Sequence, residues 1–151
     1  MCSSDLTPPA GRVLGVDLGS RRIGLALSDP SRTIASPLVV LQRSSDVVAD
    51  RRAVLAAAQE HEVTLVVVGH PLSMNGKEGP AAKAARAEAD ALRELAAGGV
   101  AVTLYDERLT TVSAHDALRS AGVRGRDRTA VVDKVAAAVM LQAYLDGAGP
   151  R

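Results

Sequence analysis

The stretch VLGVDLGSRRIGLALSD, residues 13–29, places the carboxylate of Asp17 in the middle of an apolar run. A charged side chain is costly to bury without a partner, so a strand with only a structural role would carry Val or Ile at this position. Two short apolar segments, 13–18 and 22–28, flank the sequence GSRR, which is the pattern of a β-hairpin. The first strand is therefore predicted to hold an acid close to its end.

The glycines beside this acid have two readings. Side chains alternate along a strand, so Asp17 is predicted to share its face with Val13, Gly15 and Gly19, while the residues between them face the other way. Glycine weakens a strand, which suggests that another group approaches the backbone closely. The alternative is a hairpin with an acid near its end, in which the glycines serve only the turn.

The rest of the chain reads as helices and strands in alternation. The predicted elements are an extended segment 33–43, a helix 45–61, a strand 64–69, a loop 70–80, a helix 80–97, a strand 100–108, a helix 110–122, a basic loop 123–128 and a helix 129–147. Pro37 indicates an edge strand or a bulge. The first helix has Ser45 or Asp46 as its N-cap, and its predicted apolar stripe comprises positions 47, 48, 54, 55 and 58. This order predicts an α/β domain with a mixed sheet.

Length and composition favour one globular domain. The 151 residues are 47% apolar and 23% charged, and the net charge is +1. We expect tails at 1–11 and 148–151 around a single domain at 12–147, with residues 1–11 disordered. The chain has no Phe or Trp and only two Tyr, so base stacking on aromatic rings is disfavoured. The lone Cys2, the absence of a signal-peptide pattern and the absence of a membrane-length apolar run lead us to expect a cytoplasmic protein without a membrane partner.

Two further acidic positions could join Asp17. In YDERLTT, Asp106 and Glu107 face opposite sides of a continuing strand, and periodicity does not choose between them. Asp133 lies in the first turns of the last predicted helix, on the border of its apolar stripe. Both positions also suit a purely structural role, because acids near a helix N-terminus interact favourably with the helix dipole.

Taken together, the acids indicate a metal site. Clustered carboxylates repel one another and persist when a cation neutralises them. All-oxygen ligands select hard ions, Mg²⁺ or Mn²⁺, and two such ions can promote phosphodiester cleavage. The three histidines, 61, 70 and 115, lack zinc-site spacing.

Four segments of the chain resemble, in order, the motifs of the YqgF/RuvX family, whose members are described as Holliday junction resolvases and pre-16S rRNA nucleases. The segments are GVDLGSRRIGLALSD, VVVGHPLSMNGKEG, YDERLTT and VVDKVAAAVMLQAYL, and the resemblance runs from about residue 13 to residue 146. It implies an RNase H-like three-layer fold, with a mixed five-stranded sheet flanked by helices and acids at strand ends and on the last helix.

The resemblance also implies site residues. It assigns the catalytic and metal-binding acids to Asp17, Glu107 and Asp133, and so favours Glu107 over Asp106. Asp29 matches a further family acid, with an outer-shell contact as its expected role. His70 stands where the family pattern leads us to expect an apolar residue, and the basic residues before Asp133 are shifted by a few positions.

A phosphodiester substrate needs positive charge near the acids. The candidate nucleic-acid-binding residues are Arg21, Arg22, Arg108, Arg124, Arg126 and Arg128. For most of them the alternative is ordinary solvated charge, and for Arg108 an ion pair with a nearby acid. The segment SMNGKEG is either a flap beside the site or a plain connection. Thr110 and Thr111 read as a helix cap rather than as nucleophiles.

The functional expectation is a hydrolase: a Mg²⁺- or Mn²⁺-dependent nuclease that cuts structured nucleic acid, either precursor rRNA or branched DNA. Ribosomal particles are further candidate partners, and a homodimer would suit a symmetric junction. The first alternative is a non-catalytic nucleic-acid-binding module of ribosome assembly. The second is a relative of actin-like phosphotransferases, which would need a second lobe that 151 residues cannot hold.

Overall fold

The computed structural model describes residues 11–73, 75–107 and 128–148, and in the last segment the side chains from residue 135 to residue 147. Its strands are β1 (Arg12–Leu18), β2 (Arg22–Ser28), β3 (Ala35–Gln42), β4 (Val63–His70) and β5 (Ala101–Asp106). Its helices, within these described residues, are α2 (Val47–Glu60), α3 (Pro80–Ala96) and α5 (Arg128–Ala148).

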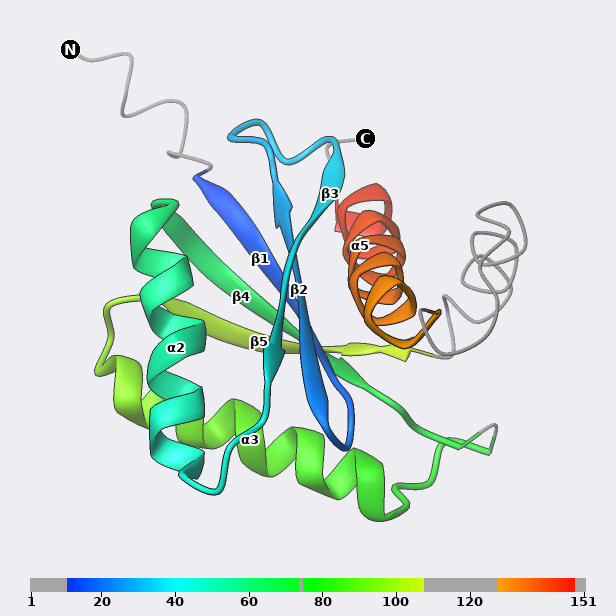
Figure 1. The fold of residues 1–151 in the computed structure, drawn as a ribbon. Helices are drawn as coiled ribbons and strands as arrows, with labels where there is room; N and C mark the ends of the chain where they lie inside the picture. Colours follow the sequence, from blue (N-terminus) through cyan, green and yellow to red (C-terminus); the bar gives the residue numbers. More distant parts are fainter. Residues whose placement is uncertain (1–10, 74, 108–127, 149–151) are drawn as a thin grey trace, which may run out of the picture.

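The strands form one five-stranded sheet in the order β3-β2-β1-β4-β5 (Figure 1). The hairpin β1–β2 and the pair β2–β3 are antiparallel, whereas β4 pairs in parallel with β1 and with β5. The mixed five-stranded sheet expected from the sequence is therefore confirmed. Pro37 lies on the edge strand β3, opposite a register shift between Leu25 and Ala26 of β2, so it marks both an edge and an irregularity.

Each face of the sheet carries its own apolar core. On one face, Leu14 and Val16 of β1 belong to a cluster with residues of α2 and α3. On the other face, Val13 of β1 and Val67 of β4 pack against α5. The layers are thus α2 and α3, the sheet, and α5, as Figure 1 shows. The predicted alternation along the first strand is confirmed, because Val13 and its neighbours Leu14 and Val16 belong to different cores.

The close approach suggested by the glycines occurs at Gly15. A Cβ atom built on Gly15 would lie 2.9 Å from the Cβ of Leu141 and 3.4 Å from the carbonyl oxygen of Ala137. Helix α5 therefore rests almost on the backbone of β1. Gly19 has the other role that the sequence left open, because its own N–H donates to the carbonyl of Arg22 at 2.8 Å within the hairpin turn.

The first helix corrects one expectation. Asp46 is its N-cap and accepts a hydrogen bond from the N–H of Ala49 at 3.0 Å, as predicted. Val47 and Val48, however, are 47% and 44% exposed, and of the helix only Val54 and Ala58 are buried. The start of α2 projects beyond the core, so the buried stripe begins at Val54, about two turns later than predicted.

Near the C-terminus the helix starts one residue earlier than expected, so Arg128 belongs to α5 rather than to the basic loop. The predicted helix 110–122 and the remainder of that loop lie outside the described residues. No helix of the described segments is both long enough and apolar enough to cross a membrane.

Candidate active site

Asp17 and Glu107 end up at the same edge of the sheet. Asp17 is the penultimate residue of β1, and Glu107 directly follows β5. Strand β4 lies between these two strands and is parallel to both, so the carboxyl ends of all three meet at one edge. Such an edge is where open α/β sheets usually bind ligands.

Gly69 of β4 lies between the two acids and has no side chain to separate them. In the parallel ladder Val16 pairs with Val68, so the next residues along, Asp17 and Gly69, lie level with each other about 5 Å apart. A Cβ built on Gly69 would be 2.7 Å from Oε2 of Glu107 and 2.8 Å from its Cδ. The carboxylate of Glu107 therefore lies over Gly69, on the strand neighbouring β1.

Electrostatics show that the two acids interact. The pKa of Glu107 is raised from 4.5 to about 7, first because burial penalises its charge and then because of the negative charges of Asp17 and Asp106. Val67, two residues before Gly69, packs against α5, and so the Glu107 carboxylate lies on the α5 face. This is also the face predicted for Asp17. Asp106, by contrast, is paired with His70 in the β4–β5 ladder.

Asp133 belongs to α5, but its side chain is not among those described. It precedes Ala137 by four residues and Leu141 by eight, and both of these are fully buried against the sheet. Residues spaced by four lie on one face of a helix, so the helical period predicts that position 133 faces the sheet as well. Within the described residues no group of three His, Cys, Asp or Glu side chains could hold a metal ion, and a third ligand would have to come from elsewhere, such as Asp133.

Comparison with known proteins identifies the family. A model described as "RuvX: Holliday junction resolvase" matches residues 11–147. This chain belongs to the RuvX family.

Among the relatives of this RuvX-family protein, one from Mycobacterium leprae (strain Br4923) is 46% identical over 144 residues, which cover 95% of this chain and 77% of the relative. One from Myxococcus xanthus (strain DK1622) is 45% identical over 139 residues, covering 92% of this chain and 90% of the relative. Both carry the name "Putative pre-16S rRNA nuclease".

The fold has a solved counterpart. The structure "T. thermophilus RuvC in complex with Holliday junction substrate" aligns with a TM-score of 0.56 over 91% of this chain and 96% of that chain, at 19% identity. At this identity the likeness concerns the fold, and it confirms the expected RNase H-like architecture of the RuvX-family protein.

The candidate substrate-binding arginines divide into two groups. Arg21 is exposed in the turn that follows β1, and Arg22 is half-buried at the start of β2, at the same edge of the sheet as the acids. Arg128 is the first residue of α5. The remaining candidates, Arg108, Arg124 and Arg126, lie outside the described residues, as do Thr110 and Thr111.

Asp29 is not near the acids, and its expected outer-shell role is wrong. In the hairpin, Asp17 pairs with Gly24, and Asp29 lies five residues beyond Gly24, directly after β2, roughly 16 Å away. Its Oδ1 accepts hydrogen bonds from the N–H groups of Thr33 and Ile34, each at 2.8 Å. These bonds and one from the Ser31 hydroxyl hold the pKa of Asp29 well below its usual range. Asp29 therefore fixes the β2–β3 turn at the opposite edge.

His70, which stands where the family pattern predicts an apolar residue, makes a polar contact with Glu78. Its Nε2 lies 2.8 Å from Oε2 of Glu78, whose Oε1 lies 3.1 Å from an NH2 of Arg86. Glu78 belongs to the segment between β4 and α3, so these contacts tie that segment to the sheet and to α3. Within it, the N–H of Ser73 donates to the carbonyl of Lys77 at 3.0 Å. The segment thus has internal hydrogen bonds; whether it touches substrate stays a prediction.

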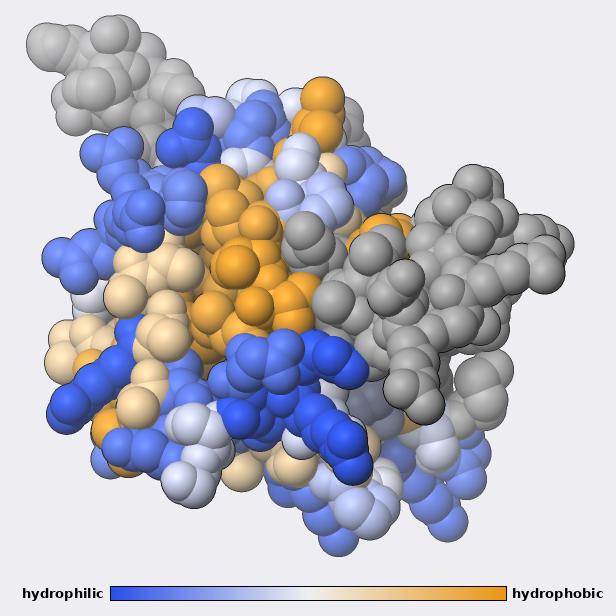
Figure 2. Space-filling model, in the orientation of Figure 1, coloured by the Kyte–Doolittle hydropathy of each residue, from blue (hydrophilic) through white to orange (hydrophobic). Residues whose placement is uncertain are grey.

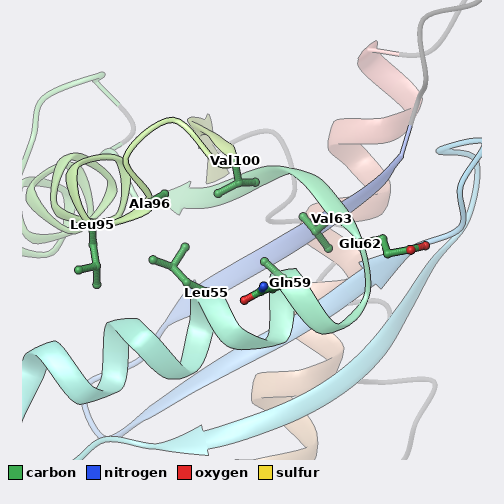
Figure 3. A pocket seen from close by; sticks show the side chains of 9 residues that line it. Leu55, Gln59, Glu62, Val63, Leu95, Ala96 and Val100 are labelled. Atoms are coloured by element: carbon green, nitrogen blue, oxygen red, sulfur yellow. The ribbon is translucent and has the colours of Figure 1, made fainter.

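A pocket of about 490 Å³ lies elsewhere (Figure 3). Side chains at the ends of α2 and α3 and at the starts of β4 and β5 line it, among them Leu55, Val63, Leu95 and Val100. The starts of β4 and β5 are at the edge opposite Glu107. This pocket is therefore separate from the acids.

Sequence reasoning missed Gly69. The signal was present, since a glycine ends the buried apolar run TLVVVG. A glycine inside a strand pattern often marks the close approach of another group.

Proposed function

We propose that this RuvX-family protein is a metal-dependent nuclease that hydrolyses phosphodiester bonds in structured nucleic acid. The observation that supports this proposal most directly is the Glu107 carboxylate lying over Gly69 and within electrostatic reach of Asp17. Two acids that repel each other at the ligand-binding edge of the sheet form a poor structural contact. They form a good cation site.

The donor set fits a hard divalent ion, Mg²⁺ or Mn²⁺. Asp17, Glu107 and Asp133 would supply the carboxylate oxygens, with α5 bringing the third acid to the edge. Two bound ions would stabilise the charge that develops on oxygen during phosphodiester cleavage and would make water a better nucleophile. The protein's own part is to hold the acids together on a rigid sheet and, through Arg21 and Arg22, to bind the phosphate backbone beside them.

Precursor 16S rRNA is the first substrate that we propose. Relatives about 45% identical over more than 90% of this chain are named for it. Four-way DNA junctions are the second, because the description of the family model names Holliday junction resolution. A side-by-side assay on precursor rRNA ends and on a four-way DNA junction, each with Mg²⁺ or Mn²⁺, decides between them.

The variant Asp17→Asn tests the mechanism. It should abolish cleavage, by more than about 100-fold in single-turnover rate, while leaving folding and nucleic-acid binding intact. Asp90→Asn is the matched control, because Asp90 is an exposed acid of α3 paired only along the helix surface with Arg93 among the contacts described. A wild-type rate in Asp17→Asn would remove Asp17 from the mechanism. Binding without any cleavage by the wild-type protein would favour the non-catalytic alternative.

A further inference from the structure

The turn between β1 and β2 is held from outside by an arginine that follows β3. Nε of Arg43 donates a hydrogen bond to the carbonyl of Gly19 at 2.7 Å. The backbone N–H of Arg43 donates to the carbonyl of Arg21 at 2.9 Å. Figure 2 shows hydrophilic side chains gathered below the apolar centre of the visible face, where the turn and the end of β3 lie in Figure 1.

The turn itself is tight. The N–H of Gly19 donates to the carbonyl of Arg22 at 2.8 Å, and a Cβ on Gly19 would lie 2.7 Å from that same oxygen. Ser20 and Arg21 at its tip are exposed. The turn begins only two residues after Asp17, so its conformation decides where two arginines stand relative to the acid.

Arg43 is in turn anchored by α2. The next residue, Ser44, donates its N–H and its hydroxyl to the carboxylate of Asp50 in the first turn of α2, at 3.0 and 2.7 Å. The pKa of Asp50 is lowered by these hydrogen bonds and by the positive charge of Arg43. A continuous set of contacts therefore runs from α2 through Arg43 to the hairpin turn.

We propose that Arg43 is a positioning residue, which holds the β1–β2 turn so that Arg21 and Arg22 meet the phosphate backbone of the substrate beside Asp17. The inference rests on the proposed nuclease function. Charge-assisted hydrogen bonds from an arginine to a carbonyl are directional, so this contact fixes the turn before substrate arrives. A turn ordered in advance does not have to be ordered on binding.

Two substitutions separate positioning from direct phosphate contact. In Arg43→Gln the amide nitrogen stands at the same number of bonds from the backbone as Nε, so the donor to Gly19 is kept and the charge is lost. In Arg43→Lys the charge is kept and that position becomes a methylene group. A residue that positions the turn through Nε tolerates Gln better than Lys. A residue that contacts phosphate tolerates Lys better than Gln.

We expect Arg43→Ala and Arg43→Lys to bind precursor rRNA or junction DNA about fivefold to tenfold more weakly, as the loss of one solvent-exposed hydrogen bond of ordinary strength implies, and Arg43→Gln to recover most of that affinity. In an Arg21→Ala/Arg22→Ala background, Arg43→Ala should cost little more, because the groups that it positions are gone. Near-normal binding by Lys with weak binding by Gln would overturn the proposal. So would an additive effect in the double-arginine background.

Amide hydrogen exchange of the full chain supplies a readout that does not depend on nuclease activity. The amides of Gly19 and Arg43 should exchange faster in Arg43→Lys than in Arg43→Gln, and the exposed Arg52 of α2 provides the control Arg52→Ala, which should change neither exchange nor affinity. Unchanged exchange in Arg43→Lys would refute the positioning role. If exchange rises as expected but the wild-type protein binds no nucleic acid, the proposed function fails and the structural role of Arg43 stands.

Discussion

Glu107→Gln should make the metal-free protein more stable at neutral pH while removing its cleavage activity. In the folded state the pKa of Glu107 is raised from 4.5 to about 7 by burial and by the charges of Asp17 and Asp106. The folded protein therefore holds this proton more tightly than the unfolded chain between those two pH values. Wild-type stability should fall as pH rises from about 4.5 to about 7 and then level off.

The size of the effect follows from the pKa change. A difference between 4.5 and about 7 corresponds to about 3 kcal/mol once Glu107 is fully ionised. Glu107 is only half-buried, so solvent screening reduces this value, and we expect roughly 2 kcal/mol. For a chain of this length, that is a rise in Tm of about 4–8 °C. Glutamine keeps the shape of the side chain but does not titrate, so the difference should be small at pH 4 and complete at pH 8.

Thermal unfolding of both proteins from pH 4 to pH 8, in the presence of a metal chelator, measures this. The control is Glu88→Gln, which removes a carboxylate from α3 that pairs with Arg51 rather than with another acid, and which should lower Tm or leave it unchanged. Equal Tm values for wild type and Glu107→Gln across the range, or a gap that does not vary with pH, would refute the placement of Glu107 beside Asp17. Added Mn²⁺ should then stabilise the wild type more than the variant, because the ion relieves the same repulsion.

Two further predictions concern the surroundings of the acids. Gly69→Ala should reduce cleavage by more than about tenfold, because its Cβ would come within 2.7 Å of Oε2 of Glu107. The control Gly79→Ala should cleave normally, because a Cβ at that position meets nothing within 4 Å. Equal rates for the two variants in a single-turnover assay would contradict this prediction. Neutralising Arg124, Arg126 and Arg128 together should weaken nucleic-acid binding. The slope of log K against log salt concentration should also become shallower, by about one unit per lost phosphate contact. An unchanged slope in a salt titration would exclude these residues from the interface.

The alternation of side chains along the strands, with a period of two residues, predicted most of the fold. It predicted that Val13 faces the opposite side of β1 from Leu14 and Val16, and the two separate cores confirm that alternation. The alternation predicts the structure correctly because helices cover both faces of the strand, so each side chain must enter one core or the other. The same reasoning failed at Val47 and Val48 of α2, because an apolar residue at the correct helical spacing is buried only if another element lies opposite it.

The position of an acid along its own strand did not predict the location of Asp29 or the difference between Glu107 and Asp106, because both depend on contacts with other strands. Asp29 follows an apolar strand much as Asp17 sits in one, yet the antiparallel hairpin places their carboxylates at opposite edges of the sheet. Glu107 and Asp106 are adjacent in sequence, and periodicity alone did not distinguish them, whereas the structure shows Glu107 packed against Gly69. Side-chain type and local period do not encode which strand lies next to which, and these outcomes depend on that order.

Two glycines on one face of the sheet bring the parts of the site together by different means. At Gly15 the missing side chain allows α5, which carries Asp133, to approach within a distance that a Cβ would forbid. At Gly69 it allows the Glu107 carboxylate to cross the end of β4 toward β1. Glycine costs about 1 kcal/mol of stability in such strands, and here each occurrence brings an acidic segment closer to Asp17. In the site that we propose, two residues without a side chain thus leave room for the acids, and an alanine at Gly15 or Gly69 should displace α5 or the Glu107 carboxylate.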